Sequence, residues 1–447
     1  MIDTEEYYNL PDAVEAATED DTILIVGDII DYDGVVIDAE KTINIDINGK
    51  TIKMRSPFTN NGTLHIMNTS DEEAHINSYG TGYLFVNNAN ATLNLDNITI
   101  NAKYGVSNTA QANFTGNNLT IVSSHTAVNN TGTMELNDID ITAAEYSIYG
   151  YGAGTGTIND SVLTSSRNAV YTNNGATLTL NNVEINGPVS NNSSTLTLND
   201  LDINGKTYNN GTLYLNSVKI DQIIENGAIS LFHNRGTATI KKTTIEVEDI
   251  NKNSTGTTIA IQNEGTLYVL DESEIIATIS DNLTFSYRIV KGINNTNQLF
   301  FEDSTLTVNG NIYTSEYPSF GIYNESGTST VRTGDITVDG MISYGLYVNT
   351  GDLILGIPEP PNSPNYGGEF ADVSLTNPHV LSKGITGIGV KNAGGHFKYY
   401  DGIIIGSTSA KPEVASDIEY LYESFDYIDE DTGYEYSILE WMRKVGG

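Results

Sequence analysis

One short phrase is repeated along the chain, and this repetition constrains the fold more than any other feature of the sequence. Each copy has a small residue, an aliphatic residue, an aromatic or polar residue, and then Asn and Gly or a close variant. Clear copies are NAVYTNNG at 168–175, SLFHNRG at 230–236, TIAIQNEG at 258–265, FGIYNESG at 320–327 and YGLYVNTG at 344–351. A phrase written this often indicates a structural repeat and not a single active site.

The segments between the copies are typical of short β-strands. They alternate apolar with polar residues, as in TLNLDNITI at 92–100, TLTLNNVEI at 177–185 and TLTLNDLDI at 195–203. Such period-2 alternation, bounded by Asn and Gly, predicts strands that bury every second side chain. Because the strands recur at a short spacing, the pattern favours a solenoid over a sandwich.

The Asn of the phrase defines a column of thirteen positions, ten of which are Asn. The position two residues earlier is apolar in twelve of the thirteen copies. Residues i and i+2 of a strand share a face, so both columns are expected to point into the core. Amides on successive coils would then hydrogen-bond to one another and satisfy polar groups at a buried bend. The predicted members of this Asn ladder are Asn87, Asn108, Asn130, Asn191, Asn209, Asn234, Asn263, Asn295, Asn324 and Asn392.

Successive ladder positions lie 18 to 32 residues apart, with one interval of 44. Coils of this length, with three short strands each, predict an all-β chain that forms a right-handed, single-stranded parallel β-helix. On these two columns, residues 21 to about 405 resemble the pectin-lyase-like β-helix superfamily. That superfamily includes pectate lyases, polygalacturonases and adhesin-like surface proteins of bacteria and archaea. The resemblance implies the fold and leaves the activity open.

Three parts are expected along the chain, because the ends of a solenoid need caps. Residues 1–22 are predicted to form an N-terminal cap helix that starts at Asn9 or Asp12. Residues 23–395 are predicted to form the β-helix. Residues 396–447 are predicted to form a C-terminal capping strand and hairpin that turns near residues 431–433. This tyrosine-rich, acidic end resembles a C-terminal module of Gram-positive surface proteins, and a separate binding module is the alternative for it.

Two insertions are expected to leave the coils. IPEPPNSPNYGGEF at 357–370 contains four prolines and cannot sit inside a parallel ladder. Loops of that length often carry function, but a tolerated insertion is the alternative. The wider ladder intervals between residues 234 and 324 predict longer side loops there, such as EDINKNSTG at 248–256.

The charge of the chain limits its partners. The chain has 21 Lys and Arg against 57 Asp and Glu, for a net charge of −36. Nucleic acid is therefore not an expected partner, and no segment is long and apolar enough to insert directly into a membrane. The chain lacks cysteine and opens MIDTEEYY, without a signal peptide. We expect an extracellular or cell-surface segment whose export signal and anchor lie outside this chain.

Enzymes with this type of fold use recognisable residues, and the sequence lacks them. Polygalacturonase-like hydrolases need spaced carboxylates, but the one Asp–Asp pair, Asp20 and Asp21, lies in the expected cap. Pectate lyases need a basic residue beside bound calcium. Arg167 and Arg235 stand alone on polar coils, as surface residues usually do. We therefore expect no catalytic residue and no enzymatic activity.

No cofactor is expected, and calcium is the one metal that the sequence leaves open. The six His show no metal-binding spacing, and there is no Cys. Acidic pairs at Asp31 and Asp33, at Asp138 and Asp140, and in the 429–435 loop are the candidate calcium ligands. None of them matches a calcium-binding motif.

The residue between the two inward columns must face solvent, and in five copies it is tyrosine. Outward aromatic side chains on a flat face can stack on sugar rings or contact a partner. The alternative is that Tyr simply favours exposed strand positions. The candidate contact residues for a glycan or protein are Tyr149, Tyr171, Tyr208, Tyr323 and Tyr347.

These observations lead to one function and two alternatives. We expect a non-enzymatic, monomeric β-helix stalk or adhesin segment of a microbial surface protein that binds glycan or a host surface. The first alternative is a polysaccharide-active enzyme, a hydrolase or lyase, with an unrecognised carboxylate pair. The second is a phage-type fibre, which would require a trimer.

Overall fold

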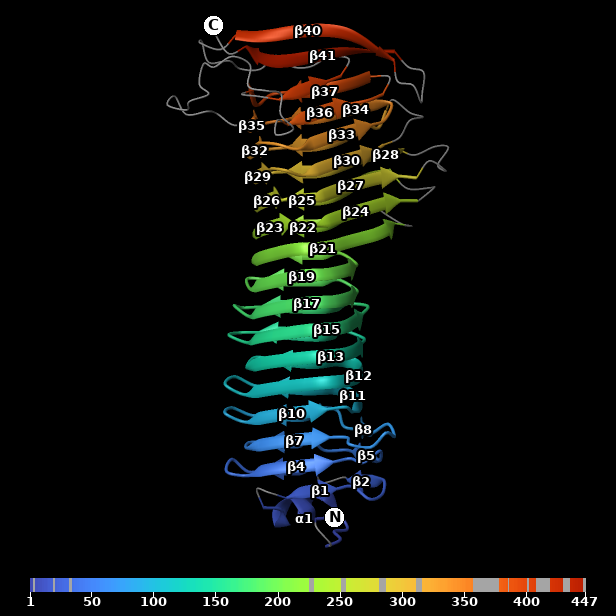
Figure 1. The fold of residues 1–447 in the computed structure, drawn as a ribbon, viewed down its shortest axis with the longest axis vertical. Helices are drawn as coiled ribbons and strands as arrows, with labels where there is room; N and C mark the ends of the chain where they lie inside the picture. The colour runs from blue at the N-terminus through green and yellow to red at the C-terminus, as the bar shows by residue number, and fades with distance from the viewer. Residues whose placement is uncertain are drawn as a thin grey trace. The chain divides into compact units, whose positions relative to one another are not determined.

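In the computed structural model, the chain divides into two compact units, unit 1 (residues 1–213) and unit 2 (residues 214–447). Strand is the main secondary structure of each unit, and each has the expected right-handed parallel β-helical architecture. Figure 1 shows the strands of each unit stacked coil on coil. The structure describes residues 1–2, 5–18, 21–31, 34–224, 229–250, 255–280, 287–310, 316–356, 378–384, 386–399, 402–406, 419–428 and 435–444.

The strands of unit 1 form three parallel stacks. The first stack contains β1 (Thr22–Leu24), β4 (Thr42–Asp46), β7 (Thr63–Met67), β10 (Thr92–Asp96), β12 (Asn113–Asn130), β13 (Thr133–Ala143), β15 (Thr155–Ser165), β17 (Thr177–Asn186) and β19 (Thr195–Asn204). The second stack starts with β2 (Ile29–Asp31), β5 (Thr51–Met54), β8 (His75–Ser78) and β11 (Thr99–Asn108). The third contains β3 (Val35–Ile37), β6 (Phe58–Asn60), β9 (Tyr83–Asn87), β14 (Tyr146–Tyr151), β16 (Asn168–Asn173), β18 (Val189–Asn192) and β20 (Thr207–Asn209). β11 and β12 are long enough to bend from one stack into the next.

Unit 2 repeats this arrangement, and the unit boundary falls within β21 (Thr212–Ile224). One stack contains β23 (Thr237–Lys241), β26 (Thr266–Leu270), β29 (Gln298–Phe301), β32 (Thr328–Val331), β35 (Asp352–Leu355) and β38 (His396–Tyr399). The next contains β21, β24 (Thr244–Asp249), β27 (Glu274–Ile279), β30 (Thr305–Asn309), β33 (Asp335–Asp339), β36 (His379–Ser382) and β39 (Ile403–Ile405). The third contains β22 (Ile229–Asn234), β25 (Thr255–Asn263), β28 (Tyr287–Asn295), β31 (Ser319–Asn324), β34 (Ile342–Val348) and β37 (Thr386–Asn392).

The core of each unit is filled by the inward residues of these strands. In β17 the sequence TLTLNNVEIN buries Leu178, Leu180, Val183 and Ile185 and leaves the residues between them at the surface. Parallel pairing in register places like residues directly above one another, as with Leu178 and Leu196. Apolar columns of this kind therefore continue through the interior of each unit.

The small residue of the repeated phrase is required by a bend in the third stack. Two consecutive residues are buried there, for example Ser147 and Ile148, so the strand turns between two outward residues. A Cβ atom on Gly321 would lie 2.4 Å from the carbonyl oxygen of Gly345 in the next coil. Backbone from the neighbouring coil thus leaves no room for a large side chain at this position.

The predicted Asn ladder is present, and its side chains are buried. In unit 1, the Nδ2 atoms of Asn87 and Asn108 each donate to the Oδ1 atom of the next ladder Asn, at 2.8 Å. In unit 2, Asn263 and Asn295 donate to the next coil in the same way, at 2.7 and 2.9 Å. The second proton of Asn108 Nδ2 goes to the carbonyl oxygen of Thr133 at 2.8 Å. The ladder asparagines therefore satisfy one another and the backbone at the bend. Two further links of this ladder join Asn191 to Asn209 and Asn234 to Asn263.

The ladder differs from the prediction at both its N-terminal and its C-terminal end. The ladder begins one coil earlier than expected, because Asn60 donates to Asn87 at 2.8 Å. At the other end, Asn392 is aligned with Val348, which has no hydrogen-bonding side chain. The Nδ2 atom of Asn392 instead donates to the carbonyl oxygen of Gly395 in its own turn, at 2.9 Å. Asn392 is therefore a turn residue and not a ladder member.

A second, half-buried Asn ladder in unit 1 was not predicted. Asn199 donates to Asn181, and the same amide-to-amide link continues down to Asn117, with distances of 2.8 to 3.0 Å. Here each amide donates to the previous coil, which is the opposite direction to the buried ladder. The residue after each of these amides has a positive φ, as at Asn182 (52°) and Asp200 (52°). Asn and Asp adopt this conformation more readily than other non-glycine residues, which explains the recurrent Asn-Asn and Asn-Asp pairs.

The N-terminal cap is helix α1 (Leu10–Ala16). Asn9 caps it, because its Oδ1 atom accepts a hydrogen bond from the backbone N–H of Asp12 at 2.8 Å. Leu10 and Val14 are buried, and the helix contacts β3. Lys41 closes the other end by donating to the carbonyl oxygens of Val14 and Glu15.

At the C-terminal end of unit 2, the parallel coils continue past residue 395, the predicted boundary. β38 and β39 pair with β35 and β36, and Phe397 and Ile404 are buried. This parallel pairing with the preceding coil keeps them in the β-helix up to Ile405. β40 (Glu419–Ile428) and β41 (Glu435–Lys444) then form the predicted antiparallel hairpin, with β41 beside β39. The predicted hairpin turn, the proline-rich stretch at 357–370 and residues 251–254 of the predicted side loop lie outside the described residues.

Candidate functional site

The outward tyrosines of unit 1 gather on the third stack. We call this group the unit 1 aromatic face, which consists of Tyr83, Tyr104, His125, Tyr146, Tyr149, Tyr151 and Tyr171. Tyr149 and Tyr171 are aligned in neighbouring strands, and their rings stack at 5.1 Å between centroids and 5° between planes. Tyr146 meets both rings edge-on, at 5.3 and 5.4 Å. The strand register therefore builds a compact aromatic surface from side chains of adjacent coils.

Charged groups border this face. The Oε2 atom of Glu145 accepts from Arg167 at 2.8 Å, and its Oε1 atom lies 3.3 Å from Nε2 of His125. The guanidinium of Arg167 lies over the ring of Tyr146, 5.3 Å from its centroid. An aromatic surface with a cation and a carboxylate at its edge offers both stacking and hydrogen-bonding groups to a ligand.

The phenol groups of Tyr83 and Tyr149 stay neutral over the physiological pH range. Burial raises the pKa of Tyr83 to about 12, and the neighbouring Tyr104 contributes to the shift. Burial also raises the pKa of Tyr149, and the nearby tyrosines Tyr171, Tyr146 and Tyr151 raise it further. These hydroxyl groups can therefore donate hydrogen bonds.

Unit 2 has a second group, which we call the unit 2 aromatic face. It consists of Phe320, Tyr323, Tyr344 and Tyr347. Tyr323 and Tyr347 stack at 4.9 Å and 11°, and Phe320 and Tyr344 stack at 5.1 Å and 13°. Phe320 is only 5% exposed. Lys291 lies over this face, with its Nζ atom 3.5 Å from the ring centroid of Tyr323.

The structure separates the five predicted contact tyrosines into three places. Tyr149 and Tyr171 lie together in unit 1, and Tyr323 and Tyr347 lie together in unit 2. Tyr208 is 38% exposed on β20, and Ser190 of β18 occupies the position between it and Tyr171. All five face outward as expected, but whether they bind a ligand stays a prediction.

Sequence reasoning missed the aromatic residues three positions earlier. Tyr146, Phe320 and Tyr344 precede the predicted tyrosines in YSIY, FGIY and YGLY. Because two buried residues lie between them, the bend turns the first and fourth residues of each segment to the same side. The sequence signal for these three residues is a pair of aromatic residues at positions i and i+3 of the same short segment.

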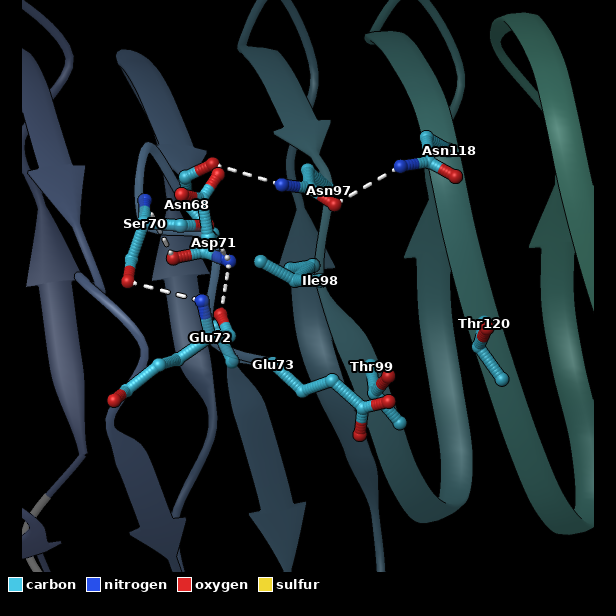
Figure 2. A pocket seen from close by; sticks show the side chains of 11 residues that line it. Asn68, Ser70, Asp71, Glu72, Glu73, Asn97, Ile98, Thr99, Asn118 and Thr120 are labelled. Atoms are coloured by element: carbon cyan, nitrogen blue, oxygen red, sulfur yellow. Dashed lines mark hydrogen bonds between the residues drawn. The ribbon is translucent and has the colours of Figure 1, made fainter.

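Unit 1 also contains an open polar pocket of about 210 Å³ beside the second stack (Figure 2). Its lining includes Asp71, Glu72, Glu73, Asn97 and Asn118. The side chain of Asn118 donates a hydrogen bond to that of Asn97 in the adjacent coil, at 2.9 Å. The side chains of Glu72 and Glu73 extend away from each other (Figure 2). The pocket is acidic, but its carboxylates do not converge on one point.

The candidate calcium ligands are not supported by the described residues. Across the described ranges, no three Asp, Glu or His side chains gather closely enough to hold a metal ion. Asp138 and Asp140 are exposed on β13. Asp33, the side chain of Asp31 and the 429–434 loop lie outside what the structure describes.

The two arginines considered as isolated bases are both paired with carboxylates. Arg167 pairs with Glu145, and Arg235 donates to Glu264 at 2.9 Å. A third arginine, Arg288, is fully buried in unit 2 against Asp249, and Thr258 donates to the same carboxylate at 2.6 Å. A buried and paired Arg–Asp couple is a structural element, because separating it would leave an unpaired charge in the core.

Comparisons with known proteins add little beyond the fold. No protein-family model and no curated protein matches the chain. Among solved structures, it is similar to two double mutants of the tailspike protein of E. coli bacteriophage HK620. Each match has 9% sequence identity and a TM-score of 0.34, and covers 95% of this chain and 86% of the tailspike chain. The described residues contain no helix that is long and apolar enough to span a membrane.

Proposed function

We propose that this chain is an extracellular, non-enzymatic β-helix segment of a microbial surface protein, and that it binds glycan through the unit 1 aromatic face. The observation that carries the proposal is the stack of Tyr149 and Tyr171, flanked by Tyr146 and bordered by the Arg167–Glu145 pair. The resemblance of the repeat to adhesin-like β-helices supports the surface location.

The geometry suits a sugar ring better than an extended apolar partner. Ser190 follows Tyr171 in the same outward column, so one face of the Tyr171 ring lies beside a small side chain. Coils are about 4.8 Å apart, so a pyranose ring placed over Ser190 would contact the Tyr171 ring from the next step of the column. The apolar face of the sugar would stack on the phenol ring of Tyr171.

A glycan array tests this proposal. We expect the purified chain to bind a subset of glycans, and the Tyr171→Ala variant to bind them about tenfold more weakly, as loss of a stacked ring predicts. Tyr79→Ala is the matched control, because Tyr79 is 69% exposed in unit 1 and outside this face. If both variants lost the same affinity for glycan, or if the wild-type chain bound no glycan, the proposed binding role would be wrong and a spacer role would be favoured.

The same samples distinguish the two alternatives. Incubation with the bound glycans should leave them intact, and release of reducing ends or unsaturated products would favour a polysaccharide-active enzyme. Light scattering should give the mass of a monomer. A trimer would favour a phage-type fibre.

A further inference from the structure

A lysine and an asparagine side chain meet on the unit 2 aromatic face. Lys291 and Asn294 lie three residues apart in β28, on either side of its bend. In the next coil, Phe320 is aligned with Lys291 and Tyr323 is aligned with Asn294. The Nζ atom of Lys291 lies 2.8 Å from Oδ1 of Asn294. A carbonyl bond is about 1.2 Å long, so the side-chain carbon Cγ of Asn294 is within about 4 Å of the amine.

The Asn294 amide is held in one orientation from both neighbouring coils. Its Nδ2 atom donates to Oε1 of Gln262 at 2.8 Å and to Oε2 of Glu325 at 3.2 Å. Both amide protons are thereby used, and Oδ1 is left to face Lys291. Asn294 is only 4% exposed, so bulk water has little access to this amide.

The amine is half-buried against the unit 2 aromatic face. Its Nζ atom lies 3.5 Å from the ring centroid of Tyr323 and 5.8 Å from that of Phe320. Burial lowers the pKa of Lys291 from 10.5 to about 8, although Glu325 partly opposes the shift. A neutral amine is a nucleophile, whereas an ammonium group is not.

We propose that Lys291 and Asn294 react with each other to form an intramolecular amide bond, with Glu325 as the group that transfers the proton. The neutral amine nitrogen of Lys291 attacks Cγ of Asn294 and forms a new C–N bond. Glu325 takes a proton from the attacking nitrogen and gives it to Nδ2 of Asn294. The bond between Cγ and Nδ2 then breaks, and ammonia leaves.

The step balances without any further reactant. An amine and a primary amide give a secondary amide and ammonia, and no oxidant or reductant is needed. The product links the two outward columns of β28 beside the stacked rings. It would fix the lysine over the aromatic face and remove its charge.

Peptide mass spectrometry of the purified full chain tests this bond. Trypsin normally cuts after Lys291, which separates residues 289–291 from residues 292–332. We expect instead one peptide of residues 289–332, lighter by one ammonia molecule, in which cleavage after Lys291 is absent. Lys391 is exposed on β37 and serves as the control site, which trypsin should cut normally.

Two variants make the result specific. Glu325→Gln keeps both reacting groups but removes the proton carrier, so the chain should recover full mass and cleavage after Lys291. Asn294→Ala should do the same because it lacks the amide. A wild-type chain of full mass would overturn the proposal. Loss of ammonia with normal cleavage after Lys291 would also overturn it, because that combination indicates a succinimide at Asn294.

Discussion

The aromatic faces of the two units are built on the same spacing but differ in the residues beside the rings. In unit 1, Tyr146 and Tyr149 occupy the two outward columns, and the adjacent cation, Arg167, is more than half exposed and paired with Glu145. In unit 2, Phe320 and Tyr323 occupy the same columns, and the adjacent cation, Lys291, is half-buried against the rings.

This difference shows how a solenoid can vary its chemistry while its backbone stays constant. The outward columns can vary in their side chains, because the buried inward residues and the backbone pairing between coils maintain the register. In unit 1 the neighbouring residues leave the rings accessible at the surface. In unit 2 the coil that precedes the rings presents an amine and an amide to each other.

The largest expected difference between the faces is in stability. Phe320→Ala should lower the free energy of unfolding by about 3 kcal/mol, because it removes an almost fully buried ring and leaves a cavity. The equivalent change in unit 1, Tyr146→Ala, should cost about 1 kcal/mol, because that ring is only partly buried. Urea unfolding of both variants measures the difference. Equal losses would mean that the two faces are packed alike.

A smaller effect should appear in the titration of Lys291. In the Glu325→Gln variant the amine stays free and no longer has the carboxylate that raises its pKa, so its labelling by an amine-reactive reagent should rise with a midpoint at or below about pH 8. Because the folded pKa lies below the ordinary 10.5, the unfolded state binds more protons between these values. The free energy of unfolding of this variant should therefore increase as the pH rises from the lowered pKa of Lys291 towards 10.5, and Lys291→Met should abolish that contribution. A labelling midpoint near the ordinary value of 10.5 would contradict the buried position.

The sequence predicted the parts of this fold that depend on repetition. The Asn ladder was visible because Asn108 and Asn130 must each match a neighbour one coil away. The second ladder was missed because its Asn-Asn and Asn-Asp pairs, as in TLTLNNVEI and TLTLNDLDI, were interpreted only as part of the alternating strand pattern. Asn392 was predicted wrongly because its copy of the phrase fits the Asn column, whereas its neighbour in the preceding coil, Val348, offers no amide for it to bond. The Lys291–Asn294 contact could not be predicted, since it depends on how the bend turns two outward side chains together.

The central claim is that like side chains stack coil on coil, and the buried Asn ladder tests it most directly. Asn108→Ala would leave Nδ2 of Asn87 and Oδ1 of Asn130 without their partner, at a cost of about 1–3 kcal/mol for each buried group. Asn210 makes a similar 2.8 Å link to Asn192 at the exposed surface, so Asn210→Ala is the matched control. We predict that Asn108→Ala lowers the free energy of unfolding by at least about 2 kcal/mol, and Asn210→Ala by less than about 0.5 kcal/mol. Equal and small losses in the two variants would contradict the stacked arrangement.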